Sequence, residues 1–365
     1  MKATPKKKPS KAARIWIGIG TALVALIAVL AILITLLWSL WLGPLFNNLF
    51  KKDDENYDPN VDIGDEGTET IDPDAYANAT DVSQIPLRGN EDGVRNILLL
   101  GIDGDSYSGR SDTTMILSIN DKAKTIKLVS LQRDTWVTIP GRDKDGDGKD
   151  DIGKLNAAYA YGRHPLQRKM IQQNFRLDID DYISVNFETL PKVIDALGGL
   201  DIKLTAAEMT QIPDHGCNTA IPTPGKDCDG QMGFVALKGE PGVHHLNGFQ
   251  AMQYARIRKL DSDFKRTARQ REVVTLMLEK AKSMNYAQLA SVITKALGCV
   301  ETNMEPAEFL GFAASAMEYM DYEIKTDYSV PQTGEYKGDT INGGAGLLLT
   351  DPKATVEKLH QYLYG

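Results

Sequence analysis

Apolar residues recur along the chain in two patterns, which predict strands in its first half and helices in its second. Continuous apolar runs at 96–102 and 114–120 are typical of strands buried on both faces of a sheet. Further strands are predicted at 125–131, 135–140, 182–187 and 200–205. Helices are predicted between them at 154–162, 165–175 and 190–199, the last closed by a pair of glycines.

Amphipathic stretches follow an irregular section that ends near residue 240. They predict helices at 247–259, 266–284, 286–297, 306–319 and 352–364. Strands that come early, with helices around them, indicate one α/β domain with a mixed central sheet between helical layers. No internal repeat is visible at any useful period.

The N-terminal part starts with a basic segment and continues with a long uncharged run. Residues 1–14 hold six basic side chains and no acid, and residues 15–42 carry no charge. At about 1.5 Å per residue, that run is long enough to cross a hydrocarbon core of roughly 30 Å. A cleaved signal peptide is the alternative, but its apolar core is only about 7–15 residues long. We therefore expect an uncleaved transmembrane anchor at 15–42, with residues 1–14 as a basic cytoplasmic tail.

The segment after the expected anchor is acidic and rich in turn residues. Residues 43–92 have little to bury, so we expect them to form an extracytoplasmic stalk, with the folded domain at 93–365. Beyond residue 14 the chain carries 35 basic and 49 acidic residues, a net charge of −14. Such a surface excludes non-specific binding to nucleic acid, which needs an excess of Lys and Arg. Any anion site must be a local basic pocket.

Two carboxylates are expected at neighbouring strand ends. Asp103 follows the strand at 96–102, and Asp112 precedes the next strand. Ligands bind at strand ends in α/β sheets, and two such carboxylates can hold one hard divalent cation. The alternative is a capped turn in which Arg110 pairs with an aspartate. Arg133 and Asp134 end the third strand, although an isolated Arg-Asp pair is commonly only a surface ion pair.

The stretch 254–271, YARIRKLDSDFKRTARQR, is strongly basic although the chain as a whole is acidic. A solvated helix face normally interleaves Glu with its basic residues, whereas here few acids balance many. Arginine predominates over lysine, which suits bidentate binding of phosphate oxygens. Carboxylates for Mg²⁺ together with several arginines are typical of phosphoryl transfer. The residues expected at this wall are Arg256, Arg258, Arg266, Arg269 and Gln270.

From about residue 94 onward the chain resembles the LytR-CpsA-Psr family. The matching pieces are NILLLGIDG, GRSDTTMIL, SLQRDTWVTIP, KLNAAYAYG, YARIRKLDSDFKRTARQREVV and HQYLYG. The resemblance implies an αβα sandwich as the catalytic domain, with an apolar pocket for a polyprenyl chain. It also implies transfer of a glycopolymer from a polyprenyl-pyrophosphate carrier onto peptidoglycan, at the 6-hydroxyl of N-acetylmuramic acid. The protein would then be a single-pass type II protein of the cell membrane whose catalytic domain is extracytoplasmic.

The resemblance also assigns residues. Asp103 and Asp112 would hold Mg²⁺ (or Mn²⁺). The pyrophosphate would be bound by Arg110, Arg133, Arg256, Arg258, Arg266, Arg269 and Gln270. Arg133, Asp134 and Asp263 would be catalytic, and each of the two acids either orients an arginine or takes the hydroxyl proton. One departure is Gln132, where many relatives have proline.

Several alternatives stay open at the sequence level. A polyprenyl-pyrophosphate hydrolase would use the same site, whereas a transcription attenuator would need a cytoplasmic DNA-binding face that residues 1–14 do not offer. The segment Asp143–Asp151 begins like a calcium loop, but Lys154 stands where the bidentate Glu should be. Cys217 and Cys228 form either a disulfide or two thiols. The transferred polymer and the oligomeric state are not determined by the sequence.

Overall fold

The computed structural model describes residues 57–60, 81–89, 93–103, 109–179, 181–214, 236–258, 260–305, 308, 318–341 and 344–365. The chain divides into two units, Met1–Leu49 and Phe50–Gly365, and every element below belongs to the second. The expected anchor at 15–42 lies outside the described residues. Within the described ranges, no helix is both long and apolar enough to cross a membrane.

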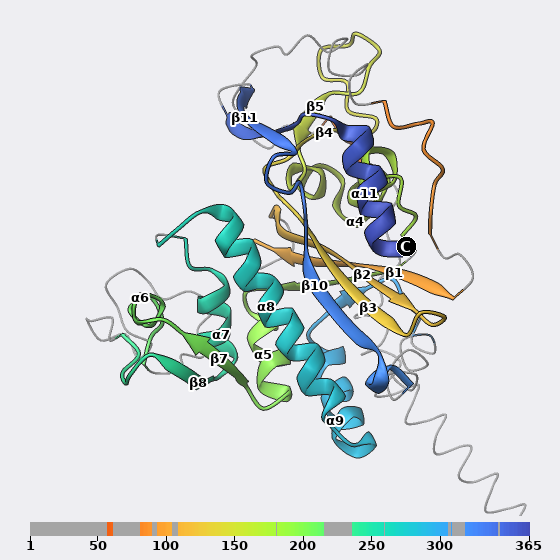
Figure 1. Cartoon of the computed structure of the whole chain (residues 1–365). Coiled ribbons are helices and arrows are strands. Elements are labelled where there is room, and N and C mark those ends of the chain that lie inside the picture. The colour runs from red at the N-terminus through yellow and green to blue at the C-terminus, as the bar shows by residue number, and fades with distance from the viewer. Residues whose placement is uncertain are drawn as a thin grey trace, which may run out of the picture. The chain divides into compact units, whose positions relative to one another are not determined.

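A mixed six-stranded sheet forms the centre of the second unit (Figure 1). Its strand order is β10-β3-β2-β1-β6-β9. β1 is parallel to β6 and β10 is parallel to β3, whereas the other neighbouring pairs are antiparallel. The predicted mixed α/β sheet is therefore confirmed. The strands are β1 Val94–Ile102, β2 Ser111–Asn120, β3 Thr125–Leu131, β6 Asp181–Asn186, β9 Glu301–Thr302 and β10 Glu323–Val330.

Alternation along β1 separates the two faces of the sheet. Leu98, Leu100 and Ile102 are buried in a core that also contains residues of α4 (Ala157–Phe175) and α11 (Pro352–Tyr364). Leu99 and Gly101 face the other way, because successive side chains of a strand alternate. On that side lie α5 (Thr189–Ala196), α7 (Gly248–Ala255) and α8 (Asp263–Lys282), as Figure 1 shows. Helices therefore lie on both faces of the sheet.

A break divides α4 where two separate helices were predicted. Gly162 and Arg163 have non-helical backbone angles, and Pro165 follows immediately. A Cβ on Gly162 would lie 2.5 Å from the Cβ of Leu166 and 2.6 Å from a ring carbon of Tyr57, so only glycine fits. The break thus follows from local sequence, as expected for a proline that cannot continue a helix.

Two predicted strands belong to small two-stranded sheets outside the main sheet. β4 (Trp136–Thr138) pairs with β5 (Ile152–Lys154), and β7 (Leu200–Leu204) pairs with β8 (Gly242–Leu246). The alternating burial of β7 suits a strand with one exposed face, whereas a central strand is apolar on both faces.

The apolar pattern of the sequence does not predict β10, nor the hairpin of β11 (Tyr336–Ile341) and β12 (Gly344–Leu349). β10 is an edge strand with mostly half-buried residues, so its apolar signal is weak. Most of the helix predicted at 306–319 lies outside the described residues, and Glu318–Asp321 form a 3₁₀ turn.

Residues 81–89, within the expected stalk, pack against the domain. Val82 and Ile85 are buried in the same core as α4 and α11. Arg88 forms a parallel bridge with Leu177, just after α4, and the Arg176 Nε donates to the Ile85 carbonyl at 2.9 Å. This part of the segment is therefore ordered against the domain by apolar burial and backbone hydrogen bonds.

Candidate functional site

A cavity of about 640 Å³ lies between the second face of the sheet and the helices α5, α7 and α8. Its apolar wall comes from all of these elements. The residues that form that wall include Leu99, Met115, Ile183, Val185, Leu190, Val193, Met252, Val273, Val274 and Met277. The alternation of side chains along the strands thus packs one apolar layer of the sheet against α4 and α11, and the apolar layer on the opposite face lines the cavity.

Charged residues line one end of the cavity. Along β1 the cavity lining changes from the apolar Leu99 to the charged Asp103. These two residues are about 13 Å apart at a rise of roughly 3.3 Å per residue. On α8 the lining changes from Met277 to Arg266, a distance of about 16 Å at 1.5 Å per residue. The polar lining residues are Asp103, Asp112, Asn186, Gln211, Gln253, Arg256, Arg258, Arg266 and Gln270. The cavity is therefore amphipathic along its length.

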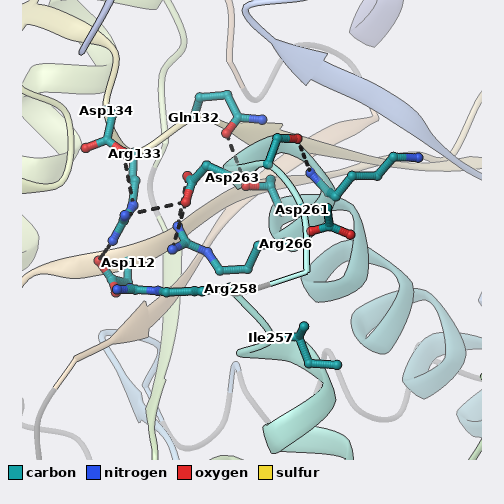
Figure 2. A network of polar contacts seen from close by, with 12 residues as sticks. Asp112, Gln132, Arg133, Asp134, Ile257, Arg258, Asp261, Asp263 and Arg266 are labelled. Carbon is teal, nitrogen blue, oxygen red and sulfur yellow. Dashed lines mark hydrogen bonds and ion pairs between the residues drawn. The ribbon is translucent and has the colours of Figure 1, made fainter. Parts of the chain in front are cut away.

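Arg133 lies beside this end and contacts three carboxylates (Figure 2). Its Nη1 is 2.8 Å from Asp112 Oδ1, its Nε 3.2 Å from Asp134 Oδ2, and its Nη2 3.4 Å from Asp263 Oδ1. Burial alone would lower the pKa of the guanidinium, but the carboxylates, Asp112 first, outweigh it and raise the pKa. Arg133 is a fixed positive charge at the end of β3.

Both oxygens of Asp112 accept from arginines. Arg133 donates to Oδ1 at 2.8 Å, and the Arg258 Nη2 donates to Oδ2 at 2.6 Å. Burial favours the neutral acid, but Arg133, followed by Arg258 and Arg266, holds the pKa of Asp112 below its usual range. Asp112 is therefore an anion at any pH at which proteins normally work.

The remaining arginines differ in their counter-charges. Arg266 is only 2% exposed and binds Asp263 through both terminal nitrogens, at 2.8 and 2.9 Å. Arg256 lies over the ring of Phe187, with its guanidinium carbon 4.0 Å from the ring centroid. Among the described residues, no carboxylate forms an ion pair with Arg256. Burial lowers the pKa of Arg256 and of Arg266, which marks both as partly desolvated cations.

Most of the expected site residues lie together. Asp103, Asp112, Arg256, Arg258, Arg266 and Gln270 line the cavity, and Arg133 and Asp263 join the cluster by ion pairs. Asp134 pairs with Arg133 and with Lys154. The Arg110 carbonyl accepts from the amides of Asp103 and Asp112, at 2.9 and 3.1 Å, which holds the two strand ends together. Arg269 is not among the described lining residues.

Three further residues take part without having been predicted for the site. Lys154 binds Asp134 at 3.2 Å, and Phe187 supports Arg256. The side chain of Gln132 accepts a hydrogen bond from Thr267 of α8 at 3.1 Å, which ties the end of β3 to that helix. Sequence gave no signal for these contacts, because each joins segments far apart in the chain.

Two other expectations lie away from the cavity. The carboxylates of Asp143, Asp145 and Asp147 have oxygens within 4.8 Å of one another, and calcium binding there stays untested. Cys217 and Cys228 lie outside the described residues, and Cys299 is a free thiol.

Fold and site together define a class: a mixed α/β protein with an amphipathic cavity whose charged end is built from arginines and aspartates. The profile of the LytR_cpsA_psr family matches residues 62–356 of the chain. The chain belongs to that family.

Relatives support the same placement. TagV of Bacillus subtilis strain 168, a polyisoprenyl-teichoic acid–peptidoglycan teichoic acid transferase, is 31% identical over 305 residues, covering 78% of this chain and 71% of that protein. Biofilm regulatory protein A of Streptococcus mutans is 31% identical over 273 residues, covering 70% of this chain and 60% of that protein. The chain likewise spans 61% of a Halalkalibacterium halodurans TagU.

Solved structures share the fold. The crystal structure of Bacillus subtilis TagV has a TM-score of 0.57 at 26% identity, covering 75% of this chain and 98% of that one. A structure of TagT bound to LIIa-WTA has a TM-score of 0.55 at 25% identity, covering 77% of this chain and 94% of that one.

Proposed function

We propose that this chain is a membrane-anchored phosphotransferase that moves a glycopolymer from a polyprenyl-pyrophosphate carrier onto peptidoglycan, at the 6-hydroxyl of N-acetylmuramic acid. The observation that carries the proposal is the cavity, whose apolar wall leads to an arginine end. A lipid pyrophosphate has the same division, with an apolar chain and a charged head. Relatives named teichoic acid transferases, and a TagT bound to LIIa-WTA, support this ligand class.

In this proposal the arginines at the charged end bind the pyrophosphate. Arg256 and Arg258 approach from the loop after α7, and Arg266 and Gln270 from α8. Guanidinium groups bind phosphate oxygens in bidentate geometry, which favours them over lysine. Arg256 has no ion-pair partner among the described residues, so binding to phosphate costs it no existing ion pair.

The reaction is a displacement at phosphorus. The acceptor hydroxyl oxygen attacks the phosphorus that carries the sugar, the bond to the bridging oxygen breaks, and polyprenyl phosphate leaves. The hydroxyl proton passes to a carboxylate beside Arg133, for which Asp134 and Asp263 are the two candidates. Arg133 stabilises the charge that develops on the phosphoryl oxygens.

Mg²⁺ (or Mn²⁺) is the proposed cofactor, held by Asp103 and Asp112. The residues present fit such an ion: both side chains line the same cavity from adjacent strand ends. Carboxylate oxygens are the ligands that Mg²⁺ prefers, and each oxygen of Asp112 keeps lone pairs beyond its arginine contact. When bound, the ion would neutralise negative charge on the pyrophosphate. Titrating Mn²⁺ into the full chain, followed by electron paramagnetic resonance, should show one site that Asp103→Asn and Asp112→Asn each weaken.

The anchor completes the proposal. Residues 15–42 would hold the protein in the cell membrane as a single-pass type II protein, with the catalytic domain outside. A reporter fused after Gly365 should be active only outside the membrane. A reporter active in the cytoplasm would refute this topology.

The activity test supplies the full-length protein in detergent with a labelled lipid-linked glycan and a peptidoglycan acceptor. Transfer of label to the acceptor and release of polyprenyl phosphate are measured together, and wild type should give both in equal amounts. Arg256→Ala, Arg258→Ala and Arg133→Ala should each remove transfer. Release without transfer would instead indicate a polyprenyl-pyrophosphate hydrolase, and full activity of an Arg256/Arg258 double variant would refute the site.

A further inference from the structure

Arg269 of α8 binds the loop that carries the cavity arginines. It is 5% exposed and makes two hydrogen bonds of 2.8 Å to the two oxygens of Asp261. Its Nη2 also donates to the carbonyl of Ile257 at 2.8 Å, and its Nη1 lies 3.5 Å from Glu208 Oε1. The hydrogen bond to Asp261, more than any other influence, raises the pKa of Arg269. All of these contacts are internal to the protein.

The described residues of the loop bound in this way are 256–258 and 260–262. α7 ends at Ala255, and α8 begins after Ser262, whose side chain accepts from the Lys265 amide. Ile257 lies directly between Arg256 and Arg258, and it is 4% exposed. A hydrogen bond to its carbonyl therefore fixes the peptide plane that contains the Cα of Arg258, two residues beyond Arg256. Asp261 holds the other end of the same loop against α8.

We propose that Arg269 and Asp261, together with the Ile257 carbonyl, form a positioning clamp that presets Arg256 and Arg258 for the pyrophosphate. The inference rests on the proposed function. It assigns Arg269 a role different from the direct phosphate contact expected from sequence, because both terminal nitrogens of its guanidinium already contact Asp261, Ile257 or Glu208. Ordered in advance, the two arginines bind the head group without first paying the entropy of fixing a loop.

Replacing Asp261 tests the clamp, because the clamp and simple electrostatics predict opposite changes in ligand affinity. Asp261→Asn removes a negative charge from the loop that binds an anion, so electrostatics alone predicts tighter binding of a lipid pyrophosphate. The clamp predicts weaker binding, because an amide replaces the carboxylate that accepts both Arg269 hydrogen bonds. A displacement of the arginines by about 1 Å costs on the order of 10²-fold in rate. We expect Asp261→Asn and Arg269→Lys each to weaken binding of a lipid pyrophosphate and to lower kcat/KM for transfer by about this factor.

One matched control removes a positive charge from the same helix, and the other removes a negative charge elsewhere in the protein. Arg271→Gln removes a positive charge two residues further along α8, where Arg271 donates to Ser130 of β3. Asp201→Asn removes an exposed acid that pairs with His245. Both controls should leave binding within about twofold of wild type, which would exclude a general effect of net charge.

The experiment measures binding of geranylgeranyl pyrophosphate to the full-length protein, alongside hydrogen exchange of the 256–262 amides without ligand. Circular dichroism tests whether each variant is folded. If Arg269→Lys is not folded, Asp261→Asn, which leaves Arg269 in place, still tests the clamp. The clamp predicts faster exchange in this loop and weaker binding. Unchanged exchange, or binding by Asp261→Asn as tight as wild type or tighter, would overturn it. If wild type itself binds no lipid pyrophosphate, the proposed function fails, and the exchange rates still decide the clamp.

Discussion

Replacing Arg256 with methionine should remove ligand binding while leaving stability nearly unchanged. The guanidinium lies over Phe187, and no described carboxylate pairs with it, so its loss leaves no buried anion behind. Burial lowers the pKa of Arg256, which means that holding this charge already costs the folded protein free energy. The lost cation–π contact, about 0.5–2 kcal/mol, is therefore offset by relief of that desolvation.

The effect on binding is larger. Phosphate oxygens in a partly dry cavity would lose their fixed counter-charge, which typically costs about 2–5 kcal/mol, or roughly 10²- to 10³-fold in affinity. Binding of a polyprenyl pyrophosphate is measured by calorimetry, and the free energy of unfolding by urea titration. Arg95→Met is the control, because Arg95 pairs with Asp181 near the start of β1, away from the charged end of the cavity. Unchanged affinity in Arg256→Met, or a loss of more than about 2 kcal/mol in stability, would refute the reasoning.

Three further predictions test other parts of the structure. Arg133→Met should destabilise the protein by about 3 kcal/mol in urea, because Asp112, with a 14% exposed side chain, loses one of its two partners. In wild type, the stability that ionised Asp112 contributes is complete above the pKa of this group in the unfolded chain, and it is lost as pH falls through the lower pKa of the folded state. In the variant, acid unfolding should therefore shift to higher pH. Acid unfolding at the wild-type pH would contradict this. Met277→Trp should block the apolar end of the cavity, weakening a long polyprenyl pyrophosphate at least tenfold while inorganic pyrophosphate binds as before; equal losses for both would be inconsistent with the assigned apolar end. Gly346→Ala should cost about 1–3 kcal/mol, because a Cβ at this position would overlap Trp136 Nε1. A melting temperature equal to wild type would show that the hairpin does not dock there.

The sequence by itself determined the features that depend on neighbouring residues. Apolar runs gave β1, β2 and β3 within a few residues of their bounds, and Pro165 gave the break in α4. Strand-end carboxylates and the basic stretch 254–271 gave most of the residues found at the charged end of the cavity. Each of these signals is local, because periodicity and strand-end position are properties of a short segment.

Tertiary structure decided which charges meet. Asp112 and Arg258 are 146 positions apart, and Arg133 and Asp263 are 130 apart, so no local pattern couples them. Arg269 shows the consequence. Its residue type and its position in a basic helix match those of a residue that binds phosphate, yet folding brings its guanidinium to Asp261 and the Ile257 carbonyl. A guanidinium binds whichever oxygens the packed elements place within about 3 Å, and that distance is set by the whole fold.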